Sequence, residues 1–334
     1  MTGDDKTNPY IRRQNEPEAP DESAPLSPHE ARLAEEERRR REAEADLEVQ
    51  IIDNVRDASA APVQPIRLTG NDRFRFRCHK GVSCWNECCY DTDITLTPFD
   101  ILALARRFDV RPAEFLATYT YPSMFDRADL PVAKLSMVDK EGGKNPCVFL
   151  DPEAGCTVYE DRPASCRYYP LGLASVKMKG HEAPEDFFFL VKESHCKGHE
   201  EDQEQTVNEF RRAQGATPFD AKNRGWMDLL MKMASWKVMG GPWGKELDAK
   251  TKKMFFMATT DPDAFRRFVF ETKFLEAYDV DPEFVERIKT DDEMLMKMAF
   301  DWLKSIIFNE ETFALREPVL RQAIAKARSD AGAV

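Results

Sequence analysis

The sequence FRFRCHKGVSCWNECCYDTDITLT, residues 74–97, carries cysteines in the spacing Cys-x5-Cys-x3-Cys-Cys. A second stretch, PCVFLDPEAGCTVYEDRPASCRYYP, residues 146–170, carries three more among glycine and proline. The chain's eight cysteines are Cys78, Cys84, Cys88, Cys89, Cys147, Cys156, Cys166 and Cys196. Cysteines clustered in this way beside turn-forming residues predict a metal or cluster site assembled from loops.

Composition narrows the classes of protein to consider. With 42% hydrophobic residues, a chain of 334 residues can bury a sizeable core. The formal net charge of -12 argues against nucleic acid or an anionic membrane as the main partner, because phosphate binding needs clustered Lys and Arg. No apolar stretch follows the opening MTGDDKTNPYIRRQ, so we expect no secretory signal and no membrane span. We therefore expect a cytoplasmic protein with reduced thiols, and we favour metal ligands over a disulfide framework.

The sequence predicts that the chain has three parts. We expect a disordered acidic arm with one charged helix at 1–66, a cysteine-cluster metal-binding domain at 67–200, and a helical carboxyl-terminal region at 201–334. The arm's helix should begin at the capping sequence Ser27-Pro28-His29-Glu30, and DASAAPVQP, residues 57–65, should be a linker. The expected fold class is α+β and mainly helical, with a small loop-and-strand cysteine-rich metal core.

Local patterns predict the individual elements. Alternating residues favour a strand at 74–78, and helices should begin near Pro98 and Pro112. Two strands are predicted at LGLASVKMKG and DFFFLVKES, residues 171–180 and 186–194. They would return the chain to the other cysteines at Cys196, which we expect to lie at the periphery of the cluster. Further helices are predicted near 203–214, 223–238, 246–258, 261–277, 282–288, 291–308 and 314–329.

The cysteine spacing constrains the chemistry of the site. No Cys-x2-Cys pair of the usual zinc kind occurs, and eight thiols exceed one tetrahedral ion, so the site is polynuclear or there are two sites. Cys88 and Cys89 could face two centres if the backbone is extended, or one could bind while the other acts as a redox or supporting thiol. Thiolate-only ligation favours an iron–sulfur cluster; zinc, or iron or copper held directly, are the alternatives. The neighbouring imidazoles, His79, His195 and His199, are expected to be at the surface or hydrogen-bonded rather than ligands.

The combined motif resembles a known family. Its parts are the first cysteine block, Ile94-x-Leu96-Thr97-x-x-Asp100-Ile101, Pro146-Cys147-x-Phe149-Leu150, Cys156-x-Val158-Tyr159 and Arg162-Pro163-x-x-Cys166-Arg167-x-Tyr169-Pro170. Over about residues 74–198 it resembles the YkgJ or CxxCxxCC cysteine-cluster family, a zinc- or iron-chelating domain that includes the flagellin lysine N-methylases. Beside a cluster, Arg162 and Arg167 could donate hydrogen bonds to sulfur, or they could pair with Asp151, Glu160 or Asp161.

Three functions follow from these features. The favoured one is a binding protein whose cysteines hold an iron–sulfur cluster or metal in a structural or redox role. The resemblance also implies an alternative: cluster-assisted methyl transfer from S-adenosylmethionine to a protein lysine, although the chain has no Gly-x-Gly-x-x-Gly, no Cys-x3-Cys-x2-Cys and no phosphate loop. The third is an interaction protein stabilised by zinc, which binds a protein partner through its acidic arm or its helical end.

Overall fold

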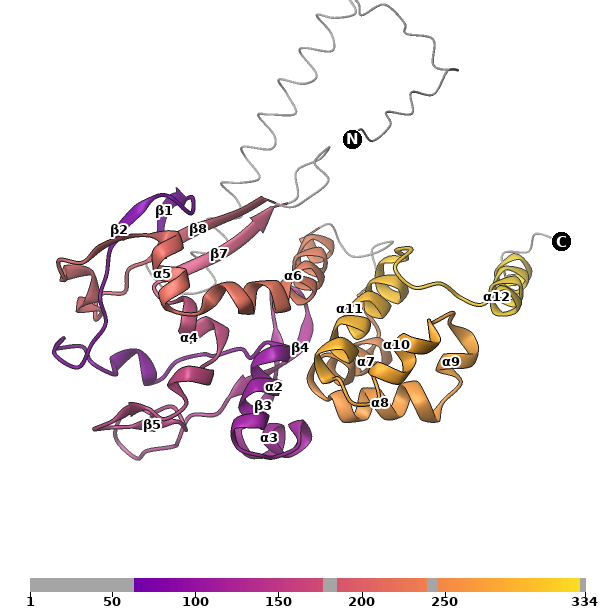
Figure 1. The fold of residues 1–334 in the computed structure, drawn as a ribbon, viewed down its shortest axis with the longest axis horizontal. Helices are drawn as coiled ribbons and strands as arrows, with labels where there is room; N and C mark the ends of the chain where they lie inside the picture. Colours follow the sequence, from indigo (N-terminus) through magenta and orange to yellow (C-terminus); the bar gives the residue numbers. More distant parts are fainter. Residues whose placement is uncertain (1–62, 177–184, 239–245, 331–334) are drawn as a thin grey trace, which may run out of the picture. The chain divides into compact units, whose positions relative to one another are not determined.

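The computed structural model describes residues 63–176, 185–238 and 246–330. The chain divides into residues 1–58 and 59–334, and everything described belongs to the second unit (Figure 1). The predicted arm helix and the disordered start lie outside the described residues. Within them there are helices α2 to α12 and short strands β1 to β9, so the fold is α+β and mainly helical, as predicted. None of these helices combines the length and apolar character needed to cross a bilayer.

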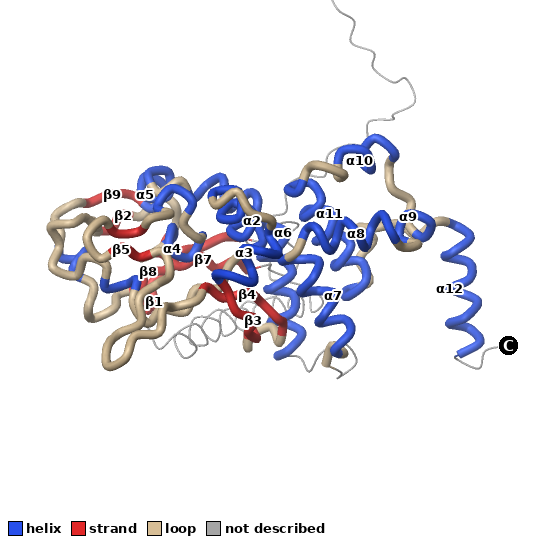
Figure 2. The backbone as a smooth tube through the Cα atoms, turned by 90° about the horizontal axis from the view of Figure 1, so that it is seen from below, coloured by secondary structure: helices blue, strands red, loops and turns tan. Residues whose placement is uncertain are grey.

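The cysteine region contains small antiparallel sheets, whose short strands stand out among loops in Figure 2. One sheet has the order β1 (Val63–Leu68), β8 (Glu185–Val191), β7 (Leu171–Val176), which confirms the two strands predicted after residue 170. A second pairs β2 (Arg73–Arg75) with β9 (Glu204–Thr206), and a third pairs β5 (Leu150–Asp151) with β6 (Gly155–Cys156). The predicted linker is wrong at its end, because Val63 pairs with Val191 in the first sheet.

The predicted helices near Pro98 and Pro112 are confirmed as α2 (Pro98–Arg107) and α3 (Pro112–Tyr119). Each has proline in its first turn, where no intrahelical N–H is needed. The hairpin that follows, β3 (Thr120–Phe125) and β4 (Leu130–Leu135), was not predicted. Both strands contain a proline, which normally argues against a strand, but a two-stranded hairpin consists only of edge strands and tolerates it.

The carboxyl-terminal region is helical as expected. Its helices are α5 (Val207–Ala213), α6 (Ala216–Val238), α7 (Ala249–Thr260), α8 (Pro262–Glu271), α9 (Phe274–Ala277), α10 (Pro282–Arg287), α11 (Asp292–Phe308) and α12 (Glu317–Asp330). The side chains of Asp248, Asp261, Asp281 and Asp291 accept hydrogen bonds from the first-turn N–H groups of α7, α8, α10 and α11. The single helix predicted at 261–277 is two helices, and the one predicted at 203–214 begins with β9.

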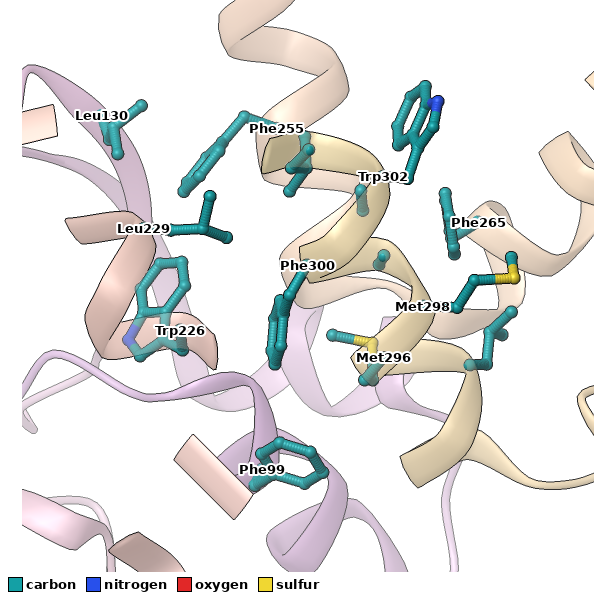
Figure 3. Packing of buried hydrophobic residues seen from close by; sticks show 14 of the residues in the cluster. Phe99, Leu130, Trp226, Leu229, Phe255, Phe265, Met296, Met298, Phe300 and Trp302 are labelled. Atoms are coloured by element: carbon teal, nitrogen blue, oxygen red, sulfur yellow. The ribbon is translucent and has the colours of Figure 1, made fainter. Parts of the chain in front are cut away.

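The largest hydrophobic cluster joins helices α6 to α11 to α2 and β4 (Figure 3). Phe99 of α2 and Leu130 of β4 meet Leu229 of α6, Phe255 of α7 and Phe300 of α11. Met233, Met296 and Met298 are buried in the same cluster, which confirms for these three methionines that they serve the core. Helices α6 to α11 are thus held together by apolar burial.

Candidate metal centre

All eight cysteines lie among the described residues and all are free thiols. Among those residues, no three His, Cys, Asp or Glu side chains converge closely enough to hold a metal ion. The expected cysteine-rich metal core is therefore not present as a closed site. The cysteines are nevertheless neighbours, and the backbone groups them in a definite way.

We call Cys78, Cys84 and Cys196 the first trio. The N–H of Arg77 donates to the carbonyl of Gly198 at 3.0 Å, and the N–H of Lys197 donates to Sγ of Cys84 at 3.1 Å. A Cβ on Gly198 would lie 2.9 Å from the Arg77 carbonyl oxygen, so this close approach requires glycine. The Cys78 thiol is close enough to Cys84 and Cys196 to interact electrostatically with both. Cys196 is thus beside the first cysteine block, not peripheral to it as predicted.

We call Cys147, Cys156 and Cys166 the second trio. The first two are brought together by a tight turn, in which Leu150 donates to the carbonyl of Cys147 at 2.9 Å and pairs with Cys156 across β5 and β6. Cys166 lies on α4 (Ala164–Tyr168) and interacts electrostatically with the other two.

Asp100 fixes the position of α4. Its carboxylate is completely buried. Oδ2 accepts a hydrogen bond from the N–H of Thr97 at 2.8 Å, and Oδ1 accepts one from the N–H of Ala164 at 2.9 Å. Burial raises the pKa of Asp100 to about 6, against the opposing effect of these donors. Asp100 is part of the sequence motif, but its contact with Ala164, 64 residues away, had no local signal in the sequence.

Peptide N–H groups point at four of the sulfurs. Besides the bond from Lys197 to Cys84, the sulfurs of Cys147, Cys156 and Cys196 each accept the N–H two residues further along the chain, from Phe149, Val158 and Gly198. Burial raises the pKa of Cys147, Cys156 and Cys196, and the N–H donors act in the opposite direction. Such donors stabilise the thiolate relative to the thiol, and the thiolate is the form that binds metal.

Cys88 and Cys89 lie between the trios. They occupy a 3-10 turn, Glu87–Cys89, that follows Asn86 in the left-handed conformation (φ 69°). The extended backbone considered from the sequence is therefore absent at this pair. The two thiols contact each other, and the Cys89 thiol is the main cause that raises the pKa of Cys88. Cys88 interacts electrostatically with Cys78 and Cys196 of the first trio and with Cys156 and Cys166 of the second.

The three histidines have partners other than cysteine. Nε2 of His79 lies 3.0 Å from Glu201, Nε2 of His195 lies 3.6 Å from Glu193, and Nε2 of His199 lies 3.0 Å from the carbonyl oxygen of Val191. These contacts agree with the expectation that the three histidines are hydrogen-bonded or at the surface.

Comparison with protein families gives a match over the cysteine region. The model of the CxxCxxCC family, described as "Putative zinc- or iron-chelating domain", matches residues 77–224. Every cysteine of the chain lies within these matched residues. The resemblance seen in the sequence is therefore confirmed. No curated protein and no solved structure matches the chain.

The CxxCxxCC match continues past the last cysteine into α6, and contacts in the structure give a reason. The buried guanidinium of Arg162 donates to Oε1 of Gln214 at 2.7 Å and stacks on Tyr159. The guanidinium of Arg167 donates to the carbonyl oxygens of Gln214 at 2.8 Å and Glu160 at 2.6 Å, and it lies over the ring of Phe219. Arg162 thus ties the loop before α4 to the end of α5 at Gln214, and Arg167 ties α4 to Gln214 and to Phe219 of α6. Their hydrogen bonds go to these groups and not to sulfur or to the carboxylates considered from the sequence.

Two features near the sulfurs were missed from the sequence. Arg107 of α2 donates to the carbonyl of Thr157 at 2.8 Å and pairs with Asp161 at 3.1 Å, which places a positive charge near Cys156. Nε1 of Trp85 and Nε of Arg167 are buried without a hydrogen-bond partner. Trp85 follows Cys84 and Arg167 follows Cys166 in the sequence, so the sulfur atoms of a bound cluster could accept hydrogen bonds from these two N–H groups.

Proposed function

We propose that the CxxCxxCC domain holds metal through its cysteine thiolates, as an iron–sulfur cluster, in a structural or redox role. The observation that carries this proposal is the set of peptide N–H groups aimed at the sulfurs of Cys84, Cys147, Cys156 and Cys196. A merely buried thiol needs no such donor, whereas a metal-bound thiolate is stabilised by it. The family description supports metal binding in general.

The donor set fits the metals that soft ligands select. Thiolates favour iron–sulfur clusters and zinc over magnesium and calcium, which prefer oxygen. The N–H groups of Trp85 and Arg167 that are buried without a partner could donate to the sulfur of a bound cluster, and such bonds raise its reduction potential. The positive charges of Arg162 and Arg107 near Cys156 would offset part of the thiolate charge.

Binding would change the protein as well as fill a site. Because the thiols do not converge in the described structure, metal binding would have to draw their loops together. Thiols must also lose their protons to become ligands, so binding would release protons and would weaken at low pH. We propose that this occurs in a reducing cytoplasm, where free thiols persist.

The test is purification without oxygen, followed by iron, acid-labile sulfide and zinc analysis and a visible spectrum. We expect a brown protein with near-equal iron and sulfide and with thiolate-to-iron charge-transfer absorption. Stoichiometric zinc without sulfide would contradict the cluster and support zinc binding by the same thiolates. A protein without any of these metals would refute the proposed function.

A further inference from the structure

The two trios of cysteines belong to different parts of the packing. The side chains of Cys147 and Cys156 pack against a hydrophobic cluster that contains Phe115 and Phe149. The side chain of Cys196 packs against another cluster, which contains Phe76 and Phe210. A single centre shared by all the thiols would have to bridge these two clusters.

Backbone hydrogen bonds follow the same division. The turn after Cys196 is joined to the strand before Cys78 by the bond from Arg77 to Gly198, and to Cys84 by the bond from Lys197. These bonds connect segments more than 100 residues apart in the sequence, as the separation of 113 between Lys197 and Cys84 shows. Tertiary hydrogen bonds therefore bring the chain segments of the first trio together without metal.

The second trio is assembled by its own contacts. Cys147 and Cys156 lie on one turn and hairpin, and α4, which carries Cys166, is tied to α2 through Asp100. The pair between the trios reaches both: the carbonyl of Cys89 accepts the N–H of Cys147 at 2.8 Å, and Cys88 interacts with Cys78.

We propose that the domain holds two metal centres, one on each trio, and that the Cys88–Cys89 pair completes both. The proposal rests on the proposed function, since it divides the same thiols. The count agrees with the chemistry: a tetrahedral thiolate ion and a cubane cluster each take four cysteines, and three from a trio plus one from the pair gives four at each centre. The peptide N–H groups aimed at sulfur are likewise shared, because Cys84 and Cys196 belong to the first trio and Cys147 and Cys156 to the second.

Metal content of single and paired variants of the full chain tests the division. Cys84→Ser should lose one centre and keep the other, so that roughly half of the metal remains. Cys156→Ser should do the same from the other side, and the double variant should hold none. Ser83→Ala, an exposed change next to Cys84, is the control and should keep both centres. Loss of all metal in either single variant, with its circular dichroism spectrum intact, would overturn the proposal.

A second measurement uses the unmodified chain, so that it does not depend on how the variants fold. Metal is withdrawn stepwise with a chelator, free thiols are alkylated at each step, and the labelled cysteines are identified by mass spectrometry. Two centres predict that the first and second trios become reactive at different chelator concentrations, each as a group. Simultaneous labelling of both trios would contradict two centres but leave the proposed function standing. Complete labelling before any chelator is added would show that no metal is held and would refute both.

Discussion

Leu229 and Phe255 of the carboxyl-terminal helices are completely buried, whereas Cys78, Cys88 and Cys166 are exposed on loops and a short helix. The helices bury aromatic and aliphatic side chains in one continuous cluster, which is the ordinary source of stability in a protein of this size. The cysteine region has strands of two to seven residues and two smaller clusters. Its stability must come more from hydrogen bonds and, under our proposal, from metal. The difference implies that the two regions respond to different perturbations.

A core substitution should produce the largest effect and should be independent of metal. Leu229→Ala removes a side chain with 0% exposure and should lower the free energy of unfolding by about 3–5 kcal/mol, because it deletes buried methyl groups and leaves a cavity. Leu320→Ala is the matched control, since Leu320 on α12 is 44% exposed, and it should change stability by less than about 0.5 kcal/mol. Denaturant titration followed by circular dichroism measures both. Similar losses in the two variants would show that the helical cluster does not carry the stability assigned to it.

Metal removal should act on the other region. If metal is present at 100 to 1,000 times its dissociation constant, its removal should cost about 3–4 kcal/mol, because a ligand stabilises only the state that binds it. Hydrogen exchange locates the effect: the N–H groups of Phe149 and Lys197, which donate to sulfur, should exchange faster after chelation. The N–H groups of α11 serve as the internal control and should not change. Faster exchange throughout both regions would mean that they unfold as one unit.

Much of the helical part could be predicted from the sequence because its signals are local. Asp261-Pro262 and Asp281-Pro282 mark the starts of α8 and α10, since an aspartate caps the helix and a proline occupies its first turn. The two strands after residue 170, the resemblance to the family and the surface or hydrogen-bonded state of the histidines were also anticipated. The break between α8 and α9 was not, because the residues at the break, Thr272 and Lys273, include no glycine or proline to mark it.

The arrangement of the cysteines could be predicted only in part. The sequence identifies the thiols, but it does not show that Lys197 reaches Cys84 or that Asp100 reaches Ala164. These contacts depend on how loops far apart in the chain fold back on one another. The turn at Cys88 and Cys89 depends on the left-handed conformation of Asn86, which a single asparagine permits but does not dictate. The hairpin of β3 and β4 was missed because its prolines argue against strands.

Asp100 ties α2 to α4 within the cysteine region, and its neighbour Phe99 packs α2 into the helical cluster, so substitution of Asp100 should have an intermediate effect. In Asp100→Asn, one oxygen is replaced by an NH2 group that faces a peptide N–H, and stability should fall by about 1–3 kcal/mol. Asp139→Asn, at an exposed loop position, is the control and should change little. Thermal and denaturant unfolding near neutral pH measure the difference.

The pH dependence of that difference provides a sharper test. The pKa of Asp100 is about 6 when folded, above the ordinary value near 4, so burial disfavours its ionised form. Asp100 therefore contributes most to stability below about pH 4, and this contribution is lost as the pH rises toward 6. The stability gap between the native chain and Asp100→Asn should accordingly narrow over this pH range. A gap that widens would show that the ionised carboxylate is the favoured form.

Truncation at the amino terminus should have the smallest effect and locates where the cysteine region begins. Removal of residues 1–58 should change the free energy of unfolding by less than about 0.5 kcal/mol, because the chain divides at this point and the segment is rich in charged residues and proline. The contrasting truncation, of residues 1–68, also removes β1, which pairs with β8 at the edge of a three-stranded sheet. It should lower the melting temperature and loosen Cys196, since β8 leads directly into the turn that carries this cysteine. Equal melting temperatures for both truncations would place the start of the cysteine region after β1, whereas a fall already at residue 58 would show that the charged arm stabilises the rest of the chain.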